Sequence, residues 1–229
     1  MHDVRVEVTP RLDGQAVDVR GNVVKGRLFQ DLNLSVGKVR SICGFVVRSP
    51  LDATALGERL DDLFVDPIIE VGRLGKAWLG DETMFHEAPD LVITVGFKPG
   101  VTDNAGSAAL DGLRTLFPET RIEGVGVATD LTYAFYGLPA DADGAIIAAS
   151  LHNPLIERAL IQTEPGPDGW NQLGYPERPA VEAQPPAAVN LEVDDEALMR
   201  LSEEGLLALN LEEMQTIRNH YRDPQVQAA

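Results

Sequence analysis

A phrase that occurs twice in the chain constrains its fold more than any other feature. The sequence reads "VDPIIEVG" at residues 65–72 and "HNPLIERA" at residues 152–159. An acid or its amide, a proline, two aliphatic residues and a glutamate thus recur in the same order. Proline lacks a backbone donor and disfavours the helical conformation in the residue before it. Each phrase therefore predicts a break in the chain, and its recurrence predicts an internal duplication.

The segments on either side of each phrase predict a helix, a stop and then a strand. Apolar residues recur at helical spacing in residues 49–64, and more weakly in residues 139–151. After each proline, β-branched residues are frequent in residues 68–71 and 155–161, which favours strands beginning there.

The text further upstream repeats as well. Residues 4–8 (VRVEV) and 91–95 (LVITV) alternate between apolar and other side chains, which is typical of strands. Each is followed by a turn containing proline or glycine and then by a helical pattern, in residues 17–32 and 101–117. An Asp-x-x-Gly occurs near the start of both helical patterns, where an aspartate is a good N-cap.

Two extended segments follow in each half, in residues 36–49 and 120–138. We expect each pair to form a hairpin, with Gly44 and residues 128–130 as the candidate turns.

The order strand, helix, strand, strand, helix, strand predicts an α+β fold of two tandem ferredoxin-like βαββαβ units that associate as a pseudo-dimer. A proline-rich stretch and a short helical tail follow. The predicted parts are repeat 1 (residues 1–74), a connection (75–89), repeat 2 (90–163), a proline-rich linker (164–191) and an acidic helical segment (192–229).

The acidic segment predicts one amphipathic helix in particular. Asn210 followed by Glu213 resembles a capping box that would start this helix. Met214, Ile217 and Tyr221 then lie on one face of it. We expect this apolar stripe to stay partly exposed as a contact for a partner protein.

The charge of the chain excludes some classes of partner. The formal net charge is −17, so nucleic acid and anionic membrane surfaces are expected to repel the chain. Cys43 is the single cysteine, which rules out an intramolecular disulfide and fits a reducing compartment. With no leader-like N-terminus and no run of 18 apolar residues, the sequence predicts a soluble, cytoplasmic protein.

Residues with the spacing of a catalytic or metal site are not found in the sequence. No two histidines have metal-ligand spacing, and one cysteine cannot form a zinc cluster. Residues 124–126 (GVG) lack the third glycine and the helix of a dinucleotide loop. We therefore predict no catalytic, cofactor-binding or metal-binding residue. The histidines are His2, His86, His152 and His220.

Three motifs together resemble phosphoribosylformylglycinamidine synthase, the ATP- and glutamine-dependent amidotransferase of purine biosynthesis. They are "FKPGVTDNAG" (residues 97–106), the repeated proline phrase, and "LMRLSEEGLLALNLEEMQTIRNHYRD" (residues 198–223), which is the most specific. The repeats resemble two copies of its small PurS subunit in tandem. The tail resembles the segment that leads into the synthetase body.

The resemblance implies a non-catalytic role in this chain. In the family, the catalytic histidine, the residues that bind ATP and magnesium, and the glutaminase cysteine lie outside the matching regions, and Cys43 matches none of them. The implied role is to bridge the synthetase catalytic portion and the glutaminase for ammonia transfer, with no cofactor bound by this chain. Two alternatives remain: a regulatory module that binds a small metabolite where the two units meet, and a self-standing enzyme.

Overall fold

We describe the protein from a computed structural model. It describes residues 2–11, 17–75, 77–80, 85–118, 124–166, 170, 173 and 188–227. The chain divides into two compact units, residues 1–179 and 180–229, and the division falls inside the predicted proline-rich linker. Most of that linker, including Tyr175, lies outside the described residues.

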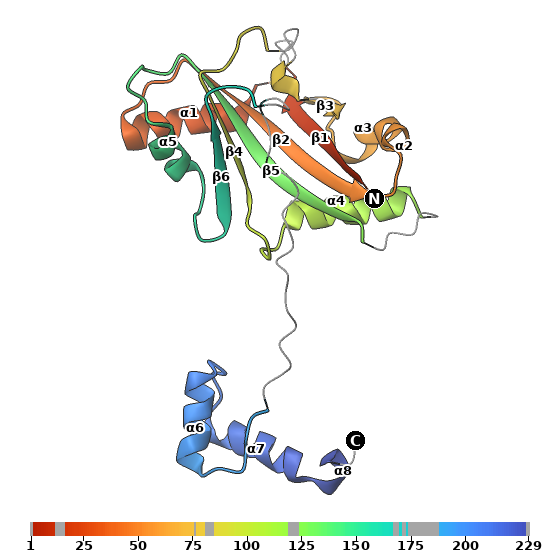
Figure 1. Cartoon of the computed structure of the whole chain (residues 1–229), viewed down its shortest axis with the longest axis vertical. Helices are drawn as coiled ribbons and strands as arrows, with labels where there is room; N and C mark the ends of the chain where they lie inside the picture. The colour runs from red at the N-terminus through yellow and green to blue at the C-terminus, as the bar shows by residue number, and fades with distance from the viewer. Residues whose placement is uncertain are drawn as a thin grey trace. The chain divides into compact units, whose positions relative to one another are not determined.

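The first unit contains one six-stranded antiparallel sheet with the strand order β3-β1-β2-β5-β4-β6 (Figure 1). Each repeat supplies three consecutive strands, so β2 and β5 meet at the centre and β3 and β6 form the two edges. The strands are β1 (His2–Pro10), β2 (Lys38–Ser49), β3 (Glu70–Leu74), β4 (Leu91–Phe97), β5 (Gly126–Tyr136) and β6 (Glu157–Gln162). The helices are α1 (Val19–Leu32), α2 (Ala53–Glu58), α3 (Leu60–Leu63), α4 (Asn104–Leu116), α5 (Gly144–Leu151) and the 3₁₀ turn η1 (Trp78–Gly80).

The register of the two central strands is symmetric about its midpoint. Val39 of β2 pairs with Phe135 of β5, and Val47 pairs with Val127. The pairing is therefore symmetric about the position where Cys43 lies opposite Leu131. The outer pairings repeat too, because β1 pairs with β3 as β4 pairs with β6. The two halves of the sheet therefore have the same pattern of strand pairing.

The two predicted hairpins are wrong. β2 and β5 are each one uninterrupted strand, so each repeat has three strands and not the four of the predicted ferredoxin-like βαββαβ plan. Gly44 lies in the middle of β2. A Cβ added at this position would lie 2.4 Å from an atom of the Arg5 side chain and 2.4 Å from one of the Asp130 side chain, so a glycine fits here although the strand does not turn. Asp130, expected in a turn, is held within the sheet by its ion pair with Arg5.

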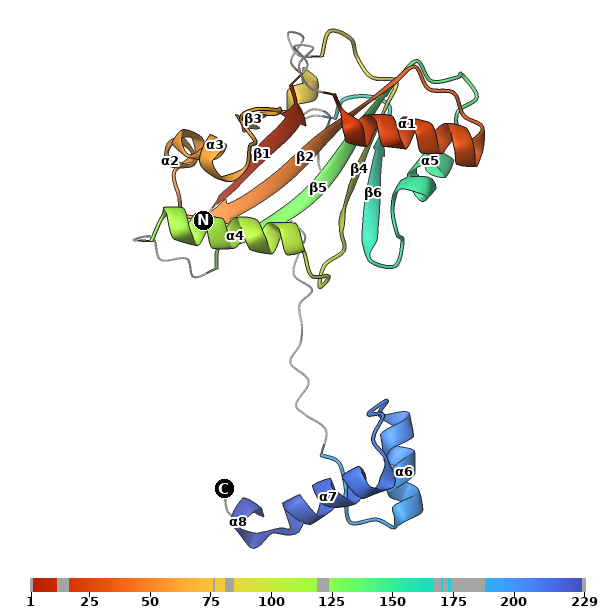
Figure 2. The ribbon, with the colours of Figure 1, turned by 180° about the vertical axis from the view of Figure 1, so that it is seen from behind.

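The long helices cover one face of the sheet, α1 across one end of the strands and α4 across the other (Figure 2). One apolar cluster joins Leu28 of α1 and Ile147 of α5 to the β4 and β5 residues Ile93 and Phe135. A second joins Leu113 of α4 to side chains from β1, β2 and the short helices. Each long helix therefore packs over strands of the other repeat, which makes the two repeats one folding unit.

The opposite face of the sheet is covered by the connection between the repeats and the start of the linker. Its apolar cluster contains Ile42, Val92 and Tyr136 from the strands, together with Leu79 and Phe85 from the connection. Trp170 joins the same cluster with 8% of its surface exposed. The linker therefore begins against the sheet.

The second unit contains the helices α6 (Asp195–Glu204), α7 (Leu211–Arg222) and α8 (Pro224–Gln227). Asn210 and Glu213 form the predicted capping box at the start of α7. Arg222 pairs through two hydrogen bonds with Glu192, and Arg218 binds the Val193 carbonyl and the Asp195 carboxylate. These bonds fasten α7 to the segment that leads into α6.

None of the described helices is long and apolar enough to cross a membrane.

Candidate functional site

The two long helices begin at equivalent aspartate clamps. Asp18 caps α1 by accepting from the Gly21 N–H, and it also accepts from the Ser41 N–H and hydroxyl on β2. Asp103 caps α4 in the same way through Gly106 and Thr129. The sequence predicted the caps, but the bonds to the central strands come from tertiary packing. Each clamp fixes the start of a helix against β2 or β5.

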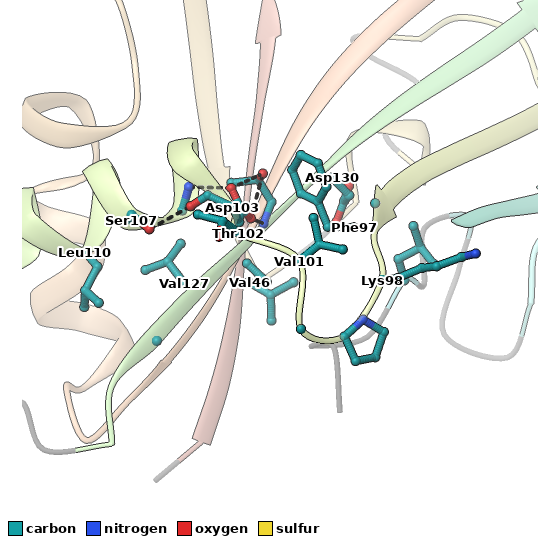
Figure 3. A pocket seen from close by; sticks show the side chains of 18 of the residues that line it. Val46, Phe97, Lys98, Val101, Thr102, Asp103, Ser107, Leu110, Val127 and Asp130 are labelled. Carbon is teal, nitrogen blue, oxygen red and sulfur yellow. Dashed lines mark hydrogen bonds between the residues drawn. The ribbon is translucent and has the colours of Figure 1, made fainter. Parts of the chain in front are cut away.

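A cavity of about 300 Å³ lies at the start of α4 (Figure 3). The turn of residues 97–102, which is the first part of the motif "FKPGVTDNAG", forms one wall, and the β5 residues 126–130 form another. Gly100, with φ of 86°, allows this turn to reverse. Lys98 extends to the Pro154 carbonyl, and the Ser107 hydroxyl donates to the Asp103 carbonyl. The best-placed polar groups are therefore engaged in holding the walls together.

A second cavity, of about 340 Å³, lies at the centre of the pairing between β2 and β5. Cys43 and Leu131, the pair at the centre of the sheet, form part of its lining together with Tyr133. Arg20 from α1 and Ala105 from α4 line it from the two helix starts. This cavity lies where the two repeats meet, and its lining is mixed apolar and charged.

Cys43 is a poor nucleophile in this setting. Burial raises the pKa of its thiol, and the nearby Arg20 guanidinium opposes that shift less strongly. An Arg20 nitrogen lies 2.9 Å from the Cys43 Sγ. A raised pKa keeps the thiol protonated near neutral pH, whereas the thiolate is the reactive form.

An ion-pair network ties the repeats together on the opposite face of the sheet. Arg5 of β1 donates two hydrogen bonds to Asp130 of β5, at 2.6 and 2.8 Å, and a third to Glu7. Burial opposes the charge on Arg5, yet the two carboxylates outweigh it and raise the pKa of the guanidinium. Glu7, 1% exposed, also accepts from the Trp78 N–H. The network therefore holds β1 of the first repeat to β5 of the second.

The repeated proline phrase folds into the same turn in both repeats. In the first, the Glu70 carboxylate accepts from the Asp66 N–H while the Asp66 carboxylate accepts from the Ile68 N–H. In the second, Glu157 and Asn153 make the equivalent bonds. The helix, stop and strand order is confirmed, but the strands begin at the glutamates, two residues later than predicted.

The turns display the aliphatic pair of each phrase to solvent. Ile68 is 79% exposed and Leu155 is 83% exposed, and their neighbours Ile69 and Ile156 are 49% and 42% exposed. Sequence reasoning placed these residues in strands. The signal that it missed is the glutamate. Its carboxylate accepts a hydrogen bond from the N–H of the residue before the proline, which closes the turn and leaves the two aliphatic side chains exposed. We call these residues the apolar turns.

The predicted partner contact on α7 is only partly exposed. Met214 is 2% exposed, so this residue of the predicted stripe is not available to a partner. The sequence showed one apolar face on α7 but not that α6 packs against α7, where Leu198 and Met214 are the buried apolar side chains. Ile217 is half-buried, and Tyr221 is 57% exposed.

Metal-binding geometry is not found among the residues that the structure describes: no group of three or more His, Cys, Asp or Glu side chains could hold an ion there. His2 and His152 instead contact the carbonyls of Leu51 and Ala148.

Comparison of the chain with protein-family models gives no match, and comparison with curated proteins gives none either. The function is therefore inferred from the geometry and from the motifs of the sequence.

Proposed function

We propose that the chain is the non-catalytic, PurS-like N-terminal portion of phosphoribosylformylglycinamidine synthase. Its two three-stranded repeats join as a pseudo-dimer through their central strands and bridge the synthetase catalytic portion and the glutaminase, so that ammonia passes between them. The chain itself binds neither ATP nor magnesium, which the family enzyme uses elsewhere. The motif resemblance supports the family, and the apolar turns support the bridging role.

The observation that carries the bridging role is the placement of the two apolar turns. Each turn leads directly into an edge strand, one into β3 and the other into β6. The strand order places these strands on opposite edges of the sheet. Exposed apolar groups on a protein surface mark interaction sites when they are grouped and rigidly held. Two such groups on opposite edges can engage two different partners at once.

Substitution of the turns tests the proposal. We expect Ile68→Ser with Ile69→Ser to weaken binding of one partner, and Leu155→Ser with Ile156→Ser to weaken binding of the other. Loss of an apolar side chain from an interface raises the Kd about tenfold or more. The measurement is titration calorimetry of the chain against the synthetase polypeptide and against the glutaminase.

The control is Phe29→Ser on α1, because this side chain is 57% exposed but belongs to neither turn. It should leave both Kd values unchanged. If neither pair of turn substitutions alters either Kd, the turns do not bridge and the proposal loses its main support.

A second candidate function is the binding of a small metabolite where the two repeats meet. The cavity of about 340 Å³ between the repeats favours it, because that volume falls in the range of ligand pockets. A metabolite present at 100 times its Kd should stabilise the chain by about 2.7 kcal/mol. A thermal-shift screen of nucleotides and amino acids measures this, and Arg20→Ala should abolish any shift that arises in this cavity.

A further inference from the structure

The loop between α6 and α7 holds a leucine in a backbone conformation that leucine rarely adopts. Leu206 has φ of 50°, in the left-handed region, and Ala208 two residues later has φ of 54°. In this region the Cβ of an L-residue crowds the following carbonyl oxygen, and glycine or asparagine is the usual occupant. Strained backbone of this kind persists where a function requires it, so Leu206 calls for a functional reason.

The strained residue is also one of the most exposed apolar side chains in the described part of the chain. Leu206 is 90% exposed and Leu207 is 51% exposed. Two leucines that remain in solvent do not stabilise the isolated unit, because it is the burial of apolar surface that stabilises a fold. The backbone therefore holds these two side chains outward at a conformational disadvantage.

Hydrogen bonds hold the loop between α6 and α7 in a defined conformation. The buried Ser202 hydroxyl donates to the Leu209 carbonyl and accepts from the Leu209 N–H, at 2.8 and 3.0 Å. The Leu207 N–H donates to the Ser202 carbonyl, and the Leu206 N–H donates to the Glu203 carbonyl. These bonds span the loop, so the two leucines are presented in a fixed geometry. We call Leu206 and Leu207 the leucine tip.

Acidic side chains flank the leucine tip on both sides in the sequence. Glu203 and Glu204 are exposed at the end of α6, and Glu212 is exposed at the start of α7. A complementary surface would offer an apolar socket for the leucines and lysine or arginine side chains around it. A lipid surface is a poor alternative, because anionic headgroups repel a chain of net charge −17.

We propose that the leucine tip docks into an apolar socket with a basic rim on the synthetase catalytic polypeptide. This inference rests on the proposed function and names the contact by which the helical unit joins that partner. The tip is distinct from Tyr221, which the sequence had suggested as a contact on α7. Its rigidity lowers the conformational entropy lost on binding.

The test uses Leu206→Gly in the full chain, because glycine removes the side chain and relieves the backbone strain together. We expect the Kd for the synthetase polypeptide to rise about tenfold or more. Amide hydrogen exchange in α6 and α7 should stay as slow as in the wild type or become slower. A purely structural role would give the opposite pattern, with faster exchange and an unaltered Kd.

Two further variants sharpen the test. Val23→Ser on α1, where the side chain is 55% exposed, should leave the Kd unchanged. Glu203→Gln with Glu204→Gln should slow association and flatten its dependence on salt, as expected when charges steer an encounter.

The outcomes separate the inference from the proposed function. If the wild-type chain binds the synthetase polypeptide and Leu206→Gly binds equally well, the leucine tip is not the contact, while the proposed function stands. If the wild-type chain fails to bind the synthetase polypeptide at micromolar concentrations, the proposed function fails and the inference fails with it.

Discussion

At the scale of single residues, tertiary neighbours decide which side chain fits. A Cβ on Gly21 would lie 2.4 Å from the Val39 carbonyl oxygen, and one on Gly106 would lie 2.4 Å from that of Val127. Both glycines therefore let a long helix approach a central strand closely. The recurring Asp-x-x-Gly was visible in the sequence as a cap, but the reason for its glycine is the approach of α1 to β2 and of α4 to β5.

Two glycines on the same helix provide a matched stability test. Gly21→Ala places a methyl group against strand backbone, so we expect the free energy of unfolding to fall by about 1 to 3 kcal/mol. A Cβ added at Gly26 would meet no heavy atom within 4 Å, so Gly26→Ala should raise it by up to about 1 kcal/mol through helix propensity. Urea unfolding of both variants measures the difference. Equal effects would mean that α1 does not approach β2 this closely.

Tyr136 carries a buried hydroxyl that has no hydrogen-bond partner among the described residues. Such a group costs about 1 to 3 kcal/mol, so Tyr136→Phe should leave stability unchanged or raise it. Burial, with a smaller contribution from Glu87, raises the pKa of Tyr136 to about 12. The unfolded chain loses this proton near pH 10 while the folded chain keeps it, so stability falls as pH rises from about 10 to 12.

Comparison of Tyr136→Phe with the wild type by urea unfolding at pH 9 and pH 11 checks this sign. The wild type should lose more stability between the two pH values than the variant, by on the order of 1 kcal/mol. Parallel losses in both proteins would show that Tyr136 titrates normally.

At the scale of elements, the aspartate clamps join each long helix to a central strand. Asp18 is 3% exposed, so its removal leaves the Gly21 and Ser41 N–H groups buried and unpaired. We expect Asp18→Ala to lower the free energy of unfolding by about 2 kcal/mol or more. Asp143, the N-cap of α5, accepts at the surface from Ala145 alone, so Asp143→Ala should cost about 1 kcal/mol.

Thermal or urea unfolding of the two aspartate variants gives the comparison. If Asp143→Ala is the more damaging, the strand half of the Asp18 clamp contributes nothing.

The sequence predicted the elements that local chemistry determines and missed those that distant partners determine. The proline stops, the helix caps and the capping box depend on residues within one turn of each other, so they were predictable. Gly44 and residues 128–130 resemble turns, so the sequence predicts hairpins where the structure has the uninterrupted strands β2 and β5. Their continuity depends on the Arg5–Asp130 ion pair and on the Asp103–Thr129 bonds, whose members are far apart in the chain.

The same distinction between nearby and distant determinants applies to the features of the candidate site. The apolar turns lie inside the repeated proline phrase, yet their exposure follows from a glutamate that hydrogen-bonds back across the turn. The sequence raised a binding site where the two units meet, but the residues that line the cavity there could not be predicted, because they depend on the register of β2 against β5. The burial of Met214 could not be predicted, because the pattern of α7 shows that the helix has an apolar face but not that α6 covers part of it.

At the scale of the whole molecule, the matching strand order of the two halves of the sheet underlies both the fold and the proposed role. Each repeat has too few strands to cover its own helix, so the helices cross over and the central strands pair. The same strand order places one apolar turn at each edge of the sheet. A bridge between two partners needs two rigid contact points, and this arrangement supplies them.

Reconstitution of the amidotransferase tests the central claim most directly. The synthetase polypeptide and the glutaminase are combined with and without this chain, and product formation is measured with glutamine and, separately, with free ammonia as the nitrogen source. We predict that omission of the chain abolishes most glutamine-driven synthesis and leaves ammonia-driven synthesis unchanged, because a bridge is needed for transfer and not for chemistry. Equal glutamine-driven rates with and without the chain would contradict the account.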